Sequence, residues 1–348
     1  MTKPHLHFII PGDIDTPTGG YGYDRKIAAG LRELGWTVDI VSLSGSYPDT
    51  DTETRLAAEA TLALLPNDAL VLVDGLAFAR LPDLVARHAG RLRLAALIHH
   101  PLADEGGLPA GTAALFEADE REALRHAAAI ICTSETTGRR LTDHFGVSSS
   151  HLYVAPPGTS RKSLLTDKRS RNRLLCVASI VPRKGHDVLI KALALIADLD
   201  WTARFIGPSR DGAWRARLDK MIADSGLENR IGFAGPLNDL DPEYAQAGIF
   251  VLATRHEGYG MAYAEALAAG LPIVGCAVGA VPEVVPPEAG ALVPADDPTA
   301  FAEELRRLLT DDATYQDAAE GARLAAERLP RWSDTTAIVA RALTESGR

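Results

Sequence analysis

Two glutamates with a fixed spacing are the side chains of this sequence most suited to chemistry. Glu257 and Glu265 stand eight residues apart in the stretch Thr254–Pro272. A strand, a glycine-rich turn and a helix are predicted around them, and the free amide N–H groups at the start of such a helix suit a phosphate. Carboxylates beside these amides would add acceptors for hydroxyl groups. The stretch therefore indicates a site for a ligand that carries phosphate and hydroxyl groups.

The elements that would position the two glutamates follow from local sequence preferences. The apolar run 249–253 has the length and composition of a buried parallel strand. Gly258 and Gly260 predict a turn, and residues 261–269 are tolerable or good helix formers. Gly270 suits the left-handed position just past a helix end. We therefore expect a helix that begins at the glycines and ends before Gly270.

Glu265 is unusual in that helix because its neighbours are alanines and a leucine. A carboxylate in an apolar setting is unfavourable unless it is hydrogen-bonded or paired. An exposed position or an arginine partner would be the usual explanation for an isolated glutamate. The diol of a ligand could also supply the donors, and the presence of Glu257 in the same motif favours that explanation.

The wider motif resembles a known family. The run His256-Glu-Gly-Tyr-Gly-Met261, followed by Glu265-Ala-Leu-Ala-Ala-Gly-Leu-Pro-Ile-Val274, is similar to the donor-site signature of retaining glycosyltransferases of family 4, which have the GT-B fold. The likeness continues through residues 279–285, 290–293, 183–185 and 19–20, so it covers most of the chain.

This resemblance gives the two glutamates separate expected roles. It implies that Glu265 binds the ribose hydroxyls of a nucleotide-sugar, and that Glu257 holds a hydroxyl of the donor sugar. Whether Glu257 acts as nucleophile or only positions the sugar stays open. The same donor site is expected to include the backbone of the turn and of the helix start, namely Gly258, Tyr259, Gly260, Met261 and Ala262.

Arg183 and Lys184 provide two cations after the predicted strand 174–180. Positive charge at this place suits a diphosphate leaving group, on which negative charge develops. Lys184 matches the donor-phosphate lysine of the family. The common Gly-Arg pair of the family is replaced here by Ala178-Ser179, so Arg183 is the candidate to take over that arginine's role. Taken alone, the two cations could equally belong to a solvated turn.

Two histidines close the predicted strand 94–98. His99 matches the active-site histidine of the family's first domain, which lies against the donor sugar, and His100 is assigned to the acceptor side. Which of the two faces the donor stays open. Gly19 and Gly20 open the first helix and match a family loop whose backbone approaches phosphate or acceptor, and we assign both to the donor-binding site.

Several further contacts are expected from their positions. Gly235 and Leu237 resemble the family's backbone contact to the nucleotide base. Asp13, at the end of the first predicted strand, and Tyr21 are candidates for the acceptor side. For Tyr244 a core role and a role beside the base are equally plausible.

Composition bounds the class of protein. A chain of 348 residues with 46% hydrophobic residues suggests two ordinary domains with sizeable cores. The net charge of −10 argues against a nucleic-acid partner. The scattered Cys132, Cys176 and Cys276 predict neither disulfides nor a metal cluster, and with no signal peptide or membrane span we expect a cytoplasmic protein. Nothing supports peripheral membrane contact, although a local basic patch would be compatible with this composition.

The alternation of apolar runs and alanine-rich stretches predicts an α/β chain with two Rossmann-like, doubly wound domains and a ligand cleft at the carboxyl ends of their strands. We place the acceptor-side domain at residues 1–165 and the donor-binding domain at 166–330. The last helix, within 331–348, is expected to pack back on the first domain. The polar, basic segment 159–173 is the predicted linker.

The resemblance implies transfer of a hexose from a UDP- or GDP-linked donor to a hydroxyl acceptor, which could be a sugar, a lipid or a small molecule. Retention of configuration is expected, without a metal or a bound cofactor. Four Asp-x-Asp pairs occur, and we interpret them as ordinary acidic turns, except that Asp13 lies near the expected cleft. An epimerase or phosphorylase of the same fold, or a non-catalytic nucleotide-sugar binding protein, are the alternatives.

Overall fold

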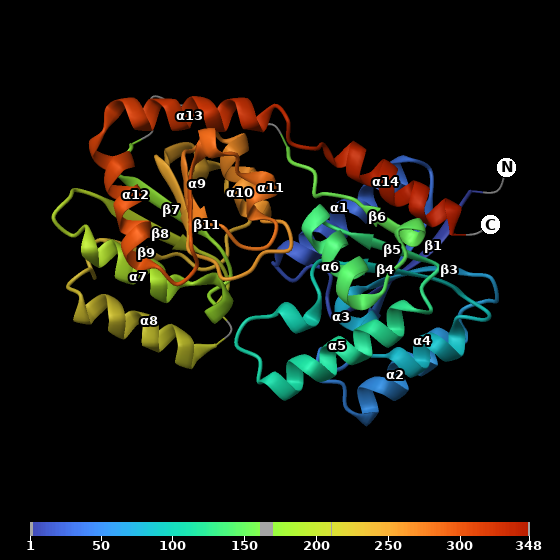
Figure 1. Cartoon of the computed structure of the whole chain (residues 1–348). Coiled ribbons are helices and arrows are strands. Elements are labelled where there is room, and N and C mark those ends of the chain that lie inside the picture. Colours follow the sequence, from blue (N-terminus) through green and yellow to red (C-terminus); the bar gives the residue numbers. More distant parts are fainter. Residues whose placement is uncertain (1–2, 161–169, 210, 347–348) are drawn as a thin grey trace. The chain divides into compact units, whose positions relative to one another are not determined.

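The computed structural model describes residues 3–160, 170–209 and 211–346, which form two compact units (Figure 1). Unit 1 comprises residues 1–158 together with 330–348, and unit 2 comprises residues 159–329. The predicted boundary after residue 165 lies outside the described residues, as does most of the predicted linker.

Unit 1 is built on a six-stranded parallel sheet with the order β2-β1-β3-β4-β5-β6. The order reverses between β1 and β3, so the carboxyl ends of these two strands form the switch point where ligands of such sheets bind. The strands are β1 (His5–Pro11), β2 (Thr37–Leu43), β3 (Leu70–Asp74), β4 (Arg93–Ile98), β5 (Ala129–Cys132) and β6 (Leu152–Val154). The helices are α1 (Gly19–Glu33), α2 (Thr52–Leu64), α3 (Gly75–Phe78), α4 (Pro82–His88), α5 (Ala110–Leu124), α6 (Glu135–Phe145) and α14 (Trp332–Glu345), with short 3₁₀ turns η1 (Leu102–Asp104) and η2 (Ser149–His151).

The last helix, α14, packs on α1 and completes the core of unit 1 (Figure 1). Gly30 of α1 makes the close approach possible, because a Cβ there would lie 2.3 Å from Oγ1 of Thr336. The hydroxyl of Thr335 donates to the carbonyl of Pro156 at 2.7 Å. Tyr23 of α1 meets Trp332 edge to face, with 5.7 Å between ring centroids. These contacts join segments that are far apart in the sequence.

Unit 2 holds a second six-stranded parallel sheet, with the order β12-β11-β10-β7-β8-β9. Its switch point lies between β7 and β10. The strands are β7 (Arg173–Val177), β8 (Thr202–Ile206), β9 (Ile231–Phe233), β10 (Ile249–Leu252), β11 (Ile273–Cys276) and β12 (Gly290–Val293). The helices are α7 (His186–Leu195), α8 (Gly212–Asp224), α9 (Asp241–Gln246), α10 (Met261–Ala268), α11 (Val281–Val284), α12 (Pro298–Thr310) and α13 (Asp312–Ala326), with the 3₁₀ turns η3 (Pro182–Lys184) and η4 (Pro287–Ala289).

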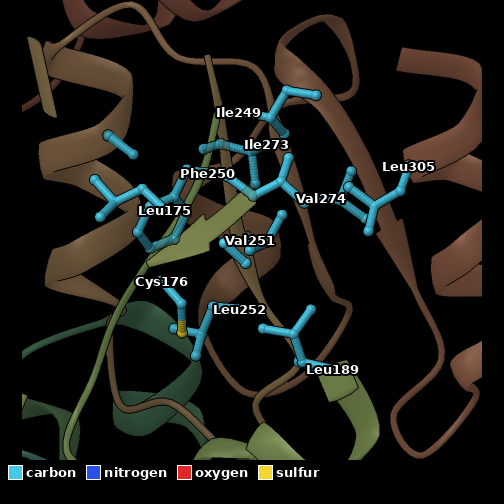
Figure 2. Packing of buried hydrophobic residues seen from close by; sticks show 14 of the residues in the cluster. Leu175, Cys176, Leu189, Ile249, Phe250, Val251, Leu252, Ile273, Val274 and Leu305 are labelled. Atoms are coloured by element: carbon cyan, nitrogen blue, oxygen red, sulfur yellow. The ribbon is translucent and has the colours of Figure 1, made fainter. Parts of the chain in front are cut away.

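The core of unit 2 surrounds its central strands (Figure 2). All four residues of β10 and all four of β11 are buried, because both faces of the sheet are covered. Leu189 of α7 and Leu305 of α12 belong to the same buried cluster. This environment explains why these strands are continuous apolar runs in the sequence.

The predicted fold class, α/β with two doubly wound sheets, is confirmed. The predicted helix after Gly260 is also confirmed, and Gly270 adopts the expected left-handed conformation with φ 68°. Sequence reasoning missed α8, because only Leu218 and Ile222 of this helix are buried and its apolar pattern is weak. No helix in the described ranges combines the length and apolar character that a membrane span needs.

Candidate functional site

Residues 183–185 and 253–260 meet at the switch point of unit 2. The turn η3 follows β7, and the glycine-rich turn follows β10, the neighbouring strand. Gly185 has φ 65°, and a Cβ at this position would lie 1.8 Å from the carbonyl oxygen of Ala253. Only glycine allows this approach. The two turns are therefore locked together by backbone packing.

Lys184 and Glu257 form an ion pair at this place. The Nζ of Lys184 lies 2.6 Å from Oε1 of Glu257, and the two side chains are 16% and 8% exposed. Burial alone would raise the pKa of Glu257, but the charges of Lys184 and Arg183 outweigh it, and the pKa is lowered. Glu257 is thus a carboxylate held ionised by a lysine.

Arg183 braces the turn that carries Glu257. Its Nη1 donates to the carbonyl of His256 at 2.9 Å, and its own carbonyl accepts from the amide of Arg255 at 2.8 Å. On the other side of the turn, the amide of Ala280 donates to the carbonyl of Glu257 at 3.0 Å. The backbone around Glu257 is therefore fixed from two sides.

Glu265 lies on α10, half-buried, with Tyr244 as a partner. The hydroxyl of Tyr244 donates to Oε2 of Glu265 at 2.8 Å. Burial raises the pKa of Tyr244 well above 10, and Glu265 adds to that rise, so the phenol remains a donor. The carboxylate expected to bind ribose is therefore oriented by a buried tyrosine.

The start of α10 is shaped by glycine. Gly260 has φ 98°, and the first helical hydrogen bond runs from the amide of Tyr263 to the carbonyl of Gly260 at 3.0 Å. The amides of Met261 and Ala262 precede that bond, and such amides at a helix start suit an anion. The side chain of Tyr263 is fully buried, and its hydroxyl donates to the carbonyl of Leu252 at 2.6 Å.

The remaining residues predicted for the donor site lie nearby or further along the same sheet edge. Gly258 and Tyr259 belong to the turn before α10, and the side chain of Tyr259 is buried. Gly235, with φ 66°, follows β9, and β8 separates that edge strand from β7. Leu237 is 37% exposed.

The switch point of unit 1 carries a second charged cluster, formed by His99, Asp24 and Asp74. The Nε2 of His99 lies 3.2 Å from Oδ1 of Asp24 and 3.4 Å from Oδ2 of Asp74. The side chains of Asp24 and Asp74 are 0% and 4% exposed, while that of His99 is 21% exposed. Burial alone would lower the pKa of His99, but the two carboxylates outweigh it and raise the pKa. Burial raises the pKa of Asp24, and His99 opposes that rise.

Gly20 belongs to the same cluster. A Cβ on Gly20 would lie 3.3 Å from Cδ2 of His99, so the glycine leaves room for the imidazole ring against the start of α1. Gly19 is the exposed first residue of α1. The structure thus brings Gly20 and His99 together.

The residues predicted for the acceptor side are dispersed around this cluster. His100 pairs with Glu105, with 3.1 Å between Nε2 and Oε2. The hydroxyl of Tyr21 donates to the carbonyl of Pro11. Asp13 is exposed, and its Oδ1 accepts from the amide of Asp15 at 2.9 Å.

The other Asp-x-Asp pairs have structural roles. Asp51 accepts from the amide of Thr54 at the start of α2, Asp239 accepts from the amide of Asp241, and Asp198 pairs with Arg306 at 2.7 Å. Within the described ranges, two groups of three side chains bring metal-ligand types of atoms within 4.8 Å of one another, namely His5, His7 and Asp39, and Asp24, Asp74 and His99. In each group a histidine nitrogen lies at hydrogen-bond distance from a carboxylate, so we interpret both as ion pairs.

Two family profiles match the chain in succession. Residues 25–162 match the family described as Glycosyltransferase Family 4, and residues 171–311 match the one described as Glycosyl transferases group 1. The two ranges together cover most of the sequence. The chain belongs to glycosyltransferase family 4.

Among curated members of this family, two relatives have similar sequences. A D-inositol 3-phosphate glycosyltransferase of Streptomyces bingchenggensis is 30% identical over 267 residues, covering 70% of this chain and 58% of the relative. A GDP-mannose-dependent alpha-(1-6)-phosphatidylinositol monomannoside mannosyltransferase of Mycolicibacterium smegmatis is 29% identical over 251 residues, covering 65% and 63%. The matching part of this chain therefore spans about three fifths of the length of these relatives.

A solved structure shows the same fold. A glycosyltransferase from Rickettsia africae superposes with a TM-score of 0.77 at 17% identity and covers 99% of both chains. The fold expected for family 4, GT-B with two Rossmann-like domains, is thereby confirmed.

Sequence reasoning on this family 4 chain missed Asp24 and Asp74, although both left a signal. Asp24 lies on the buried face of α1 with Ile27, Ala28 and Leu31, at helical spacing. An acid within such an apolar stripe is the same anomaly that drew attention to Glu265. Asp74 is the last residue of β3, at the carboxyl end of the sheet where ligands bind.

Proposed function

We propose that this family 4 chain is a retaining glycosyltransferase that moves a hexose from a UDP- or GDP-linked donor to a hydroxyl acceptor. The observation that carries the proposal is the meeting of Lys184, Glu257 and the start of α10 at the switch point of unit 2. This place joins a cation, an ionised carboxylate and free helix amides, which are the groups that a sugar diphosphate requires.

Donor binding exchanges the partners of the ion pair. In the structure Lys184 contacts Glu257 at 2.6 Å. When the donor binds, Lys184 contacts the diphosphate instead, and Glu257 accepts from a hydroxyl of the donor sugar. Arg183 and the amides of residues 260–262 add to the binding of the diphosphate. Because these groups are already positioned, they stabilise the charge that develops as the glycosidic bond breaks.

The nucleoside end of the donor occupies the side of the sheet toward Glu265. The carboxylate of Glu265 accepts hydrogen bonds from the ribose hydroxyls, and the hydroxyl of Tyr244 fixes the orientation of this carboxylate. Gly235 and Leu237 contact the base. The mannosyltransferase relative is named for GDP-mannose, so GDP- and UDP-linked hexoses are the first donors to test.

Unit 1 supplies the acceptor side and the substrate contact of His99. Tyr21, Asp13 and His100 contact the acceptor, whereas Gly19 and Gly20 contact the donor. The two curated relatives are named for inositol 3-phosphate and for a phosphatidylinositol mannoside, so polyol phosphates are the first acceptors to test.

The decisive experiment follows nucleoside diphosphate release from a panel of UDP-, GDP- and ADP-sugars, with and without acceptors. Lys184→Ala and Glu265→Ala should each lower transfer about a hundredfold or more, because each removes a contact to the donor. Lys191→Ala, an exposed lysine of α7, is the matched control and should leave transfer unchanged. Near-normal transfer by both site variants would refute the assignment.

The same panel separates the alternatives. An epimerase or phosphorylase would turn over the donor without a hydroxyl acceptor, and a binding protein would show a ligand-induced thermal shift without turnover. We propose that the two cations replace a metal at the diphosphate, so a chelator should leave the rate unchanged. A strict requirement for magnesium or manganese would contradict this part of the proposal.

A further inference from the structure

The cluster around His99 contains two buried carboxylates, those of Asp24 and Asp74. Asp24 is fully buried on α1, and its Oδ2 has no hydrogen-bond partner among the described residues. An apolar side chain would fill this position of an otherwise apolar helix face without the unfavourable burial of a carboxylate. Packing alone therefore does not explain the presence of this acid.

The two oxygens of Asp74 have different partners. Oδ1 accepts from the amide of Leu76 at 2.8 Å and so caps the start of α3, which fixes the carboxylate in place. Oδ2 lies 3.4 Å from Nε2 of His99. Asp24 approaches the same nitrogen from α1 at 3.2 Å. One imidazole N–H thus meets two carboxylates that come from two elements.

The rest of the histidine is equally constrained. Thr133 donates to the carbonyl of His99 at 2.9 Å, and Gly20 leaves space for the ring. Tyr23 meets the ring edge to face, with centroids 5.4 Å apart. Burial raises the pKa of Tyr23 well above 10, so this neighbour is uncharged near neutral pH. The charged groups that face His99 from the elements packed against it are therefore Asp24 and Asp74.

We propose that Asp24 and Asp74 are positioning residues that hold His99 as a fixed hydrogen-bond donor, with Nε2–H turned to the carboxylates and Nδ1–H left for the substrate. Nδ1 makes no hydrogen bond within the described part of the chain. Paired with two acids, the ring keeps both protons at neutral pH, and Nδ1 then donates to an oxygen of the substrate. The substrate contact rests on the proposed function, whereas the protonation state and orientation of the ring do not.

Nitrogen NMR of the imidazoles tests the proposal without any assay of activity. The chain has ten histidines, and His99→Gln identifies the signal of His99. In the unaltered protein both ring nitrogens of His99 should carry protons at pH 8. Loss of a proton near the ordinary value of about 6.5 would overturn the proposal.

Two variants probe the two carboxylates separately. Asp24→Asn and Asp74→Asn should each lower the titration midpoint of His99 by about one pH unit or more, because each removes a negative charge beside Nε2. Asp39→Asn is the matched control, since Asp39 pairs with His5 at 2.7 Å. It should leave the titration midpoint of His99 unchanged. Unchanged titration midpoints of His99 in both site variants would overturn the proposal. If a variant does not fold, the protonation of His99 in the unaltered protein at pH 8 is the deciding measurement.

A transfer assay then links the cluster to the reaction. Asp24→Asn should lower kcat/KM about tenfold or more, as for a lost hydrogen bond to a charged group, and should have no further effect in a chain that carries His99→Gln. Additive losses would show that Asp24 acts independently of His99 and would overturn the positioning role. A protein without transferase activity would refute the proposed function and leave the NMR result standing.

Discussion

The two units carry charged clusters at equivalent places in their sheets, but with opposite balances of charge. In unit 2, Arg183 and Lys184 surround one carboxylate, that of Glu257. In unit 1, two carboxylates surround one imidazole. In our proposals the excess positive charge of unit 2 binds an anionic ligand, and the excess negative charge of unit 1 holds the imidazole of His99 in one orientation. The switch points of two parallel sheets with different strand orders thus carry clusters of opposite charge balance.

Removing the cation of unit 2 should have the largest effect on stability. Lys184→Ala leaves Glu257 buried without its lysine, and we expect the free energy of unfolding to fall by about 3 kcal/mol at pH 7. Adding Glu257→Gln should restore most of this loss. Denaturant unfolding of the single and double variants measures both effects, and a double variant as unstable as Lys184→Ala would contradict the role of the pair.

The pH dependence of this loss has a definite sign. Because the folded pKa of Glu257 is lowered, its contribution to stability is present above the unfolded pKa and is lost as the pH falls through the folded value. The difference between the unaltered protein and Lys184→Ala should therefore shrink as the pH is lowered toward 4.

The backbone contact between Gly185 and Ala253, which locks two turns of unit 2 together, should contribute nearly as much to stability. Gly185→Ala places a Cβ 1.8 Å from the carbonyl oxygen of Ala253, at a residue with φ 65°. We expect a loss of about 2 kcal/mol or more, because the backbone must move. Gly212→Ala is a suitable control, since Gly212 begins α8 and has open space around it. Equal melting temperatures for the two variants would refute the lock.

Glu120 tests a buried acid that forms no ion pair with the described residues. It is 1% exposed, its Oε2 accepts from the amide of Leu102 at 3.0 Å, and burial raises its pKa to about 8. A raised pKa destabilises the fold increasingly as the pH rises from the unfolded pKa to the folded one. Glu120→Gln should therefore stabilise by about 1 kcal/mol at pH 9 and have little effect at pH 5. The exposed Glu303→Gln is the control, and a gain equal at both pH values would contradict this cause.

Gly20→Ala should have the smallest effect. The added Cβ would lie 3.3 Å from the ring of His99, which a shift of a few tenths of an ångström relieves, and alanine favours the helix. We expect the free energy of unfolding to change by less than about 0.5 kcal/mol. The titration midpoint of His99 should nevertheless move, because the ring is displaced relative to Asp24. A large loss of stability would show that this glycine is needed for packing instead.

How much the sequence could predict differs between the elements and their contacts. The strand β10, the helix α10 and the left-handed Gly270 follow from local preferences, which act over a few residues. The pairing of Lys184 with Glu257 joins residues 73 positions apart and depends on β7 lying beside β10. Strand order of this kind is a property of the whole sheet, so local patterns do not contain it.

The same limit explains the partner of Glu265. Its acidic side chain among alanines predicts that a donor is needed, but not which one. Tyr244 provides the donor from the short helix α9, which precedes β10 in the chain. Asp24 is the converse case, since its position on an apolar helix face was visible in the sequence and only its partners required the structure.

The position of α14 at the end of the chain determines when the core of unit 1 can be completed during synthesis. Ribosomes make residues 330–348 only after the whole of unit 2, although α14 belongs to the core of unit 1. Until then Gly30 and Tyr23 of α1 lack the threonine and the indole that cover them in the folded protein. Unit 2 is continuous and can finish folding first. The core of unit 1 is therefore complete only after the last helix of the chain has been synthesised.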